Sequence, residues 1–141
     1  MAVTAHWYGN VFDKAMNKEI DFEADAIHIC LLDNTYVPDQ AHDYFNDVVG
    51  DELPTAGGYT HEGKLLGVLG AAYNDGTGVF NIDATVDPVW AAATFTAAYA
   101  VIFDNTPAAD AAKPLISYID FGGDVSVTAG TFTITLAVGG I

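Results

Sequence analysis

Residues 94–121 read TFTAAYAVIFDNTPAADAAKPLISYIDF, and this stretch decides the predicted fold. Phe95 to Phe103 is a continuous run of small, aromatic and β-branched residues, and Pro114 to Phe121 is a second apolar run. Between them lies Asp104-Asn105-Thr106-Pro107, in which proline fixes φ and Asp and Asn favour turns. Two apolar runs around such a loop predict an antiparallel pair of strands. Since both runs are apolar on both faces, we expect this pair in the middle of a sandwich or barrel, covered on each side.

Shorter strands are predicted on both sides of this central pair. They cover Ala26–Leu32, Lys64–Leu69 (with an extension to Tyr73 left open), Val79–Ala84, a start at Asp87–Trp90, Val125–Val127 and Thr131–Leu136, with a further opening at Val48 and Val49. Turn signals separate them, at Asn74-Asp75-Gly76, Gly122-Gly123-Asp124 and Thr128-Ala129-Gly130. In Val79–Ala84, alternation puts Phe80 and Ile82 on one face and Asn81 and Asp83 on the other, as in an outer strand with one wet face. In Thr131–Leu136, strict alternation predicts Phe132, Ile134 and Leu136 on the inward face.

A short N-terminal helix is predicted over residues 7–17, because Trp7, Val11 and Ala15 recur at i, i+4 and i+8. We expect it either to close one open side of a sheet or to turn the aromatic pair Trp7-Tyr8 toward a partner. With about eight short strands, the chain is expected to be mainly β: an antiparallel β-sandwich or partly open barrel with this helix.

An irregular arm is predicted at about residues 34–47, the longest segment without a periodic pattern. It combines Pro38 with the aromatic residues Tyr36, Tyr44 and Phe45. Long loops in compact domains are usually functional or disordered, and aromatic side chains favour burial. We therefore expect an ordered arm or flap, with one helical turn at Ala41–Phe45.

Length and charge limit the classes of function. The 141 residues are expected to form one domain, 1–141, and the single cysteine, Cys30, is expected to be a small buried hydrophobic residue. There are 19 Asp and Glu residues against four Lys and no Arg, a formal net charge of −15. This charge argues against nucleic-acid and anionic-membrane partners. We also expect no secretory signal and no membrane-spanning segment.

Catalytic and metal-binding patterns are weak. The chain has no nucleophile-elbow, Walker, Cys-x-x-Cys or dinucleotide motif, and both serines, Ser117 and Ser126, fall in predicted strands. A metal site could be sought at His42, Asp39 and Asp43, and folding could bring His61-Glu62 to it. The spacing of these residues, however, is not that of a zinc site. We expect no enzyme, no cofactor and no metal. An enzyme is the alternative that a turnover lost on changing His42 or one specific carboxylate would reveal.

A series of short motifs runs along nearly the whole chain. In order they are Trp7-Tyr8-Gly9, Asn17-Lys18-Glu19-Ile20-Asp21-Phe22, Tyr36, Pro38-Asp39-Gln40, His42-Asp43-Tyr44, Asp47-Val48, Gly57-Gly58-Tyr59, Trp90, Thr94-Phe95-Thr96-Ala97, Tyr99-Ala100-Val101-Ile102-Phe103-Asp104, Pro114-Leu115-Ile116 and Asp120-Phe121-Gly122. Taken together they resemble a family of small virion structural proteins of tailed bacteriophages. The resemblance implies a structural component of the particle, at the exterior of the head or in the tail. Such proteins run on a little beyond Val138–Ile141, so we expect a short terminal strand here.

Within this resemblance, the first hypothesis is a capsid decoration (cement) protein, made in the host cytoplasm and bound to the major capsid protein on the outer face of the head. A homo-oligomer is expected, a trimer by analogy. Because interfaces favour aromatic residues, the expected contact residues are Trp7, Tyr8, Tyr36, His42, Tyr44 and Phe45. The alternatives are a tail protein (fibre, baseplate or tube-associated) and a carbohydrate-binding β-sandwich module with a row made of Tyr59, Tyr73 and Trp90.

Overall fold

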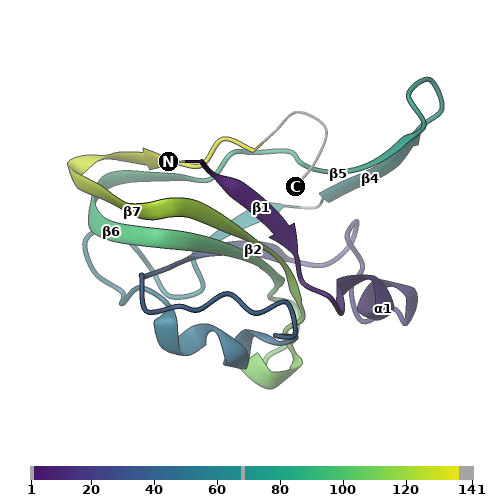
Figure 1. The fold of residues 1–141 in the computed structure, drawn as a ribbon, viewed down its shortest axis with the longest axis horizontal. Coiled ribbons are helices and arrows are strands. Elements are labelled where there is room, and N and C mark those ends of the chain that lie inside the picture. The colour runs from purple at the N-terminus through teal and green to yellow at the C-terminus, as the bar shows by residue number, and fades with distance from the viewer. Residues whose placement is uncertain (1, 68, 137–141) are drawn as a thin grey trace.

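The computed structural model describes residues 2–67 and 69–136 and is mainly β (Figure 1). In these residues a five-stranded antiparallel sheet has the order β1-β7-β6-β2-β3, and β4 and β5 form a separate two-stranded sheet. The strands are β1 (Thr4–Trp7), β2 (Ile27–Leu32), β3 (Lys64–Gly67), β4 (Leu69–Asn74), β5 (Val79–Ala84), β6 (Val89–Asp104) and β7 (Leu115–Thr133). The sheets do not close into a barrel, and the predicted mainly-β fold with a short helix is confirmed.

The central pair is confirmed as β6 and β7. Val101 lies opposite Tyr118 and Ile102 opposite Ser117, and β2 pairs with the other edge of β6. The second half of β6 is buried on both faces, as the unbroken apolar run predicts. Both serines lie within β7, as expected.

Both central strands are longer than predicted. Strand β6 takes in Val89 and Trp90 of the separate strand start expected at Asp87–Trp90, with a register shift between Trp90 and Ala93, and in β7 two of the expected turns are β-bulges. Ala97 lies opposite Val125 and Tyr99 opposite Asp120, so the residues around Gly122 and Gly123 are extra residues in β7. Both glycines have positive φ, 77° and 142°, which a side chain would disfavour. The three strands expected after residue 114 are therefore one bent strand, and the described residues hold seven strands rather than about eight.

The N-terminal helix is shorter than predicted. Helix α1 covers Val11–Met16, whereas Trp7 ends β1, which pairs with β7. The backbone N–H of Gly9 donates to the carbonyl oxygen of Gln40 at 2.8 Å, which removes it from any helical pattern. The i, i+4, i+8 spacing of Trp7, Val11 and Ala15 therefore does not mark one helix, because Trp7 belongs to β1 and the other two residues belong to α1.

Short 3-10 helices replace two further predictions. They are η1 (Phe45–Asp47), η2 (Val49–Asp51) and η3 (Asp110–Ala112). The strand expected to open at Val48 does not form, because Val48 lies between η1 and η2. The helical turn expected at Ala41–Phe45 is also wrong, since the first helical turn begins only at Phe45. The predicted strand Lys64–Leu69 is divided between the two sheets: β3 ends at Gly67, which has a φ of 84°, and β4 begins at Leu69.

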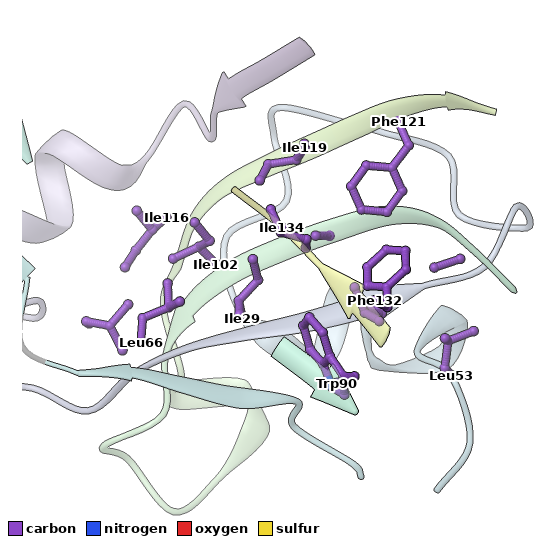
Figure 2. Packing of buried hydrophobic residues seen from close by; sticks show 14 of the residues in the cluster. Ile29, Leu53, Leu66, Trp90, Ile102, Ile116, Ile119, Phe121, Phe132 and Ile134 are labelled. Atoms are coloured by element: carbon purple, nitrogen blue, oxygen red, sulfur yellow. The ribbon is translucent and has the colours of Figure 1, made fainter. Parts of the chain in front are cut away.

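The five-stranded sheet is covered on both faces. On the first face, Ile29, Leu31 and Ile102 pack with Trp90 and Phe132 and with other apolar side chains from β4, β5 and β7 (Figure 2). Phe132 and Ile134 are buried and Leu136 is partly buried, so the inward face predicted for this last segment is confirmed. The short strand expected at the C-terminal end lies outside the described residues.

On the second face, Cys30, Leu32, Val101 and Phe103 pack against the arm that follows β2. Cys30 is fully buried and burial raises the pKa of its thiol, which confirms the prediction of a small hydrophobic residue. The arm of residues 34–47 is ordered, as expected, and it is the layer that covers this face (Figure 1).

Candidate functional site

Tyr8 and Tyr36 form the centre of the arm's attachment. Both side chains are buried, with 1% and 2% exposed, and their hydroxyl oxygens lie 2.8 Å apart. The Tyr36 hydroxyl also lies 3.4 Å from Nδ1 of the half-buried His42. Burial raises the pKa of Tyr8, and it raises the pKa of Tyr36 to about 12. Both phenols therefore stay protonated at neutral pH and serve as hydrogen-bonding groups that hold the arm in place.

Tyr44 ties the arm to α1. The buried ammonium of Lys14 lies 3.2 Å from the centre of the Tyr44 ring, and the Tyr44 hydroxyl donates to Oε2 of Glu19 at 3.1 Å. Lys14 also pairs with the carboxylates of Glu19 and Asp43, at 3.5 and 3.8 Å. A cation over an aromatic face, with two carboxylates beside it, fixes the position of the arm relative to the helix.

Phe45 belongs to the protein core. It is fully buried and stacks on Phe103 of β6 with ring centres 4.3 Å apart. Trp7 is half-buried, with its ring centre 5.6 Å from that of the exposed Phe12.

The expectation that all six aromatic and histidine residues face a partner therefore needs correction. Tyr8, Tyr36 and Phe45 are buried within the protein, because the sheet needs an apolar cover on its second face. Trp7, His42 and Tyr44 keep partly exposed side chains, and their contact with a partner stays a prediction.

The row of aromatic residues expected for carbohydrate binding does not form. Tyr59 and Trp90 are buried in the first core with ring centres 6.3 Å apart, and of the three residues only Tyr73 is exposed. The two buried rings cannot stack on a sugar without opening the core, so the structure does not support this reading.

A buried polar network lies around Glu52. Its Oε1 accepts from the Tyr59 hydroxyl and from the backbone N–H of Glu62, both at 2.6 Å, and Oε2 lies 2.5 Å from Nδ1 of His61. The Tyr59 hydroxyl oxygen in turn accepts from the backbone N–H of Leu31 at 3.0 Å. Burial raises the pKa of the Glu52 carboxyl despite these hydrogen bonds. Every contact joins the 52–62 loop to itself or to β2, which is the geometry of a structural brace.

A neighbouring ion pair joins Glu62 to the buried Lys113, which also pairs with Asp110 at 3.0 Å. Asn105 donates to Oε2 of Glu62 at 2.9 Å. Burial alone would raise the pKa of Glu62, but the hydrogen bonds from Lys113 and Asn105 outweigh it and hold the pKa below its usual range. This pair fastens the loop before β7 to the loop before β3.

The surface of the described residues has open hollows, one of mixed and one of mostly apolar lining. One of about 530 Å³ is lined by Ala15, Ile20, Phe22 and Ala71 together with charged side chains of the turn after α1. In residues 2–67 and 69–136, no group of three or more His, Cys, Asp or Glu side chains is placed to hold a metal ion. Neither His42 with Asp39 and Asp43 nor His61-Glu62 is brought into such a group.

The β4–β5 hairpin carries the most prominent exposed aromatic side chains. Tyr73 and Phe80 face each other across its two strands, and 61% and 60% of their surfaces are exposed. Phe80 and Ile82 share a face of β5, as predicted, but only Ile82 reaches the core. The loop end of the hairpin extends away from the five-stranded sheet, which leaves Phe80 uncovered (Figure 1). Sequence alternation alone could not reveal where the cover ends.

Comparisons with family models, with curated proteins and with solved structures found no match for this chain. In the part of the chain that the structure describes, no helix has the length and apolar character needed to cross a membrane.

Proposed function

We propose that this chain is a virion structural protein, and most specifically a capsid decoration (cement) protein on the outer face of a phage head. The observation that carries this proposal is the β4–β5 hairpin, which holds exposed aromatic side chains away from a body built of braced loops and packed sheets. Such a molecule is suited to act through contact. The motif order from Trp7 to Gly122 supports a virion role through its resemblance to phage structural proteins.

The net charge of −15 supports an exterior position. Packaged DNA repels an acidic protein, so a place outside the shell costs less free energy than one inside it. Repeated weak contacts with the major capsid protein across a symmetric lattice would give high avidity without any catalytic group. A homo-oligomer, such as a trimer at a symmetry axis, would increase that avidity further.

The test is to locate and count the chain in intact particles of the phage that carries it. Cryo-EM density on the head surface, with hundreds of copies per particle by quantitative mass spectrometry, is the expected result. Density restricted to the tail, with a few to tens of copies, would replace the cement role by that of a fibre, baseplate or tube-associated protein. Absence from purified particles would end the virion proposal in both forms.

A second measurement tests the cementing role itself. Particles produced without the chain should release their DNA at a lower temperature than complete particles, and adding the purified protein back should restore the difference. An unchanged release temperature in both comparisons would show that the protein does not stabilise the shell.

A further inference from the structure

We propose that the aromatic pair Tyr73 and Phe80, at the loop end of the β4–β5 hairpin, docks into an apolar depression rimmed by Lys and Arg on a partner protein. This inference rests on the proposed function, under which the partner surface belongs to a subunit of the capsid shell. The hairpin would be the anchor, and the rest of the molecule would be the body that the anchor holds on the shell.

The first reason is the continuity of one apolar face along the hairpin. Side chains alternate along a strand, so Leu69, Ala71 and Tyr73 share a face with their cross-strand partners Ala84, Ile82 and Phe80. At the base of the hairpin this face is buried, with Leu69 at 0% and Ile82 at 6% exposure. At the loop end the same face has no cover. The core-forming pattern thus continues beyond the core, as expected for a surface that is covered only in an assembly.

The second reason is the kind of side chain that is exposed. Single exposed apolar residues are normal on a protein surface. Tyr73 and Phe80, in contrast, are an adjoining aromatic pair on one face, whereas the exposed Val79 lies beside the turn on the opposite face. Aromatic residues are enriched at protein interfaces because they bury a large area at a small conformational cost.

The third reason is that the loop end has a fixed conformation. Oδ1 of Asn74 accepts hydrogen bonds from the backbone N–H groups of Gly76 and Thr77, at 2.9 and 3.2 Å, and the N–H of Gly78 donates to the Asn74 carbonyl at 2.8 Å. A closed turn of this kind loses little conformational freedom on binding, so the contact energy of the aromatic pair is retained.

Charge indicates the chemistry of the partner. Residues 69–84 contain Asp75 and Asp83 and no Lys or Arg, and both carboxylate residues are exposed. Of the four lysines in the chain, Lys14 and Lys113 are buried in ion pairs. A second copy would therefore bring another acidic surface against the hairpin, which like-charge repulsion disfavours. Asp75 lies in the turn next to the aromatic pair, whereas Asp83 lies opposite Gly70 on the face away from the pair. A rim of Lys and Arg around an apolar depression complements both the apolar loop end and Asp75.

The experiment measures binding of the purified chain to shells assembled from the major capsid protein of the phage that carries it, prepared without this chain. Tyr73→Ser and Phe80→Ser should each weaken binding by about thirtyfold or more, the size of effect that truncating an interface anchor gives. Leu65→Ser is the matched control, because Leu65 of β3 is 59% exposed and lies on the other sheet. It should leave the affinity unchanged. Circular dichroism and thermal melts check that all three variants fold.

Charge reversal tests the rim separately. Asp75→Lys should weaken binding and slow association, more at low than at high salt, whereas Asp13→Lys on α1 should have a much smaller effect. Unchanged binding of the Asp75→Lys variant would show that the partner has no basic rim at this place.

The outcomes separate this inference from the proposed function. Wild-type protein that fails to bind the shells would count against the cement role. Wild-type protein that binds, together with Tyr73 and Phe80 variants that bind equally well, would overturn the docking role of the hairpin while leaving the cement role intact. Loss of self-association in these variants, measured by light scattering, with unchanged shell affinity would identify a second copy as the occupant and would also overturn the inference.

Discussion

At the level of single residues, Gly63 lies at one of the closest approaches between two parts of the backbone. Its φ is 66°, and a Cβ atom at this position would overlap the carbonyl oxygen of Ile29 and approach Cα of Cys30 at 2.7 Å. The loop that carries Glu62 can therefore lie against β2 only because residue 63 has no side chain.

Gly63→Ala should lower the free energy of unfolding by at least about 2 kcal/mol, because it adds both a disfavoured φ and a clash with backbone. Urea denaturation followed by fluorescence measures the change. Gly50→Ala is the control, since a Cβ at Gly50 meets no atom within 4 Å, and it should stay within about 1 kcal/mol of wild type. Equal stabilities of the two variants would contradict the close packing described for Gly63.

Glu52 gives a second prediction at this scale, on pH dependence. Burial raises the pKa of its carboxyl in the folded state above the unfolded value. The folded state then binds more protons in the window between the two values, so this residue adds stability as the pH falls through the folded pKa. Glu62 and Asp47 act in the opposite direction, because their pKa values are lowered on folding.

Glu52→Gln should remove the ionisable group at residue 52 while keeping the shape of the side chain. The stability of wild type relative to this variant should therefore increase as the pH is lowered from about 7 to about 5. Urea titrations at several pH values give this difference directly. A difference that stays constant across the range, or that decreases on acidification, would show that the buried carboxyl is not the group responsible.

At the level of elements, the arm of residues 34–47 is a structural cover. Phe45→Ala should lower the free energy of unfolding by about 3–5 kcal/mol, because it leaves a cavity next to Phe103. Hydrogen exchange should show the largest loss of protection in the arm and at β2. Phe12→Ala, at a residue with 54% of its surface exposed, should cost less than about 1 kcal/mol. A small effect of Phe45→Ala would mean that the arm is only loosely attached.

Elements with a strong periodic pattern were predictable from the sequence. Burial on both faces explains the unbroken apolar runs of β6 and β7, and burial on one face explains the alternation at Phe132 and Ile134. The bulges in β7 were not predictable, because Gly122 and Gly123 give the same local signal in a bulge as in a turn. Only the pairing with β6, which is a tertiary contact, decides between them.

The candidate site was predicted less well, for a physical reason. Tyr36 and Phe45 lie in a segment without regular period, and aromatic side chains serve both cores and interfaces. The sequence therefore could not show that these two face the sheet. The exposed face of Tyr73 and Phe80 was equally hidden, because it continues the pattern of the buried residues Leu69 and Ile82.

At the level of the whole molecule, the charge of −15 should weaken the folded state through self-repulsion. Raising the NaCl concentration from about 10 to about 500 mM should raise Tm by about 3 °C or more, which corresponds to roughly 1 kcal/mol for a chain of this size.

A charge-reduced variant provides the comparison for this effect. Asp13→Asn, Glu23→Gln, Asp75→Asn and Asp83→Asn change four exposed carboxylates on the surface, and together they should flatten the response of Tm to salt. A salt response of the same size in the variant would point to a source other than charge repulsion.

The full burial of Cys30 offers a practical route to imaging. A shielded, protonated thiol reacts poorly with maleimides, so the native protein should remain unlabelled under non-denaturing conditions. Ala111→Cys, at an exposed position in η3, would then introduce the single reactive sulfur. Each molecule would carry one fluorophore or gold cluster, and step-wise photobleaching of a labelled specimen would convert brightness into stoichiometry.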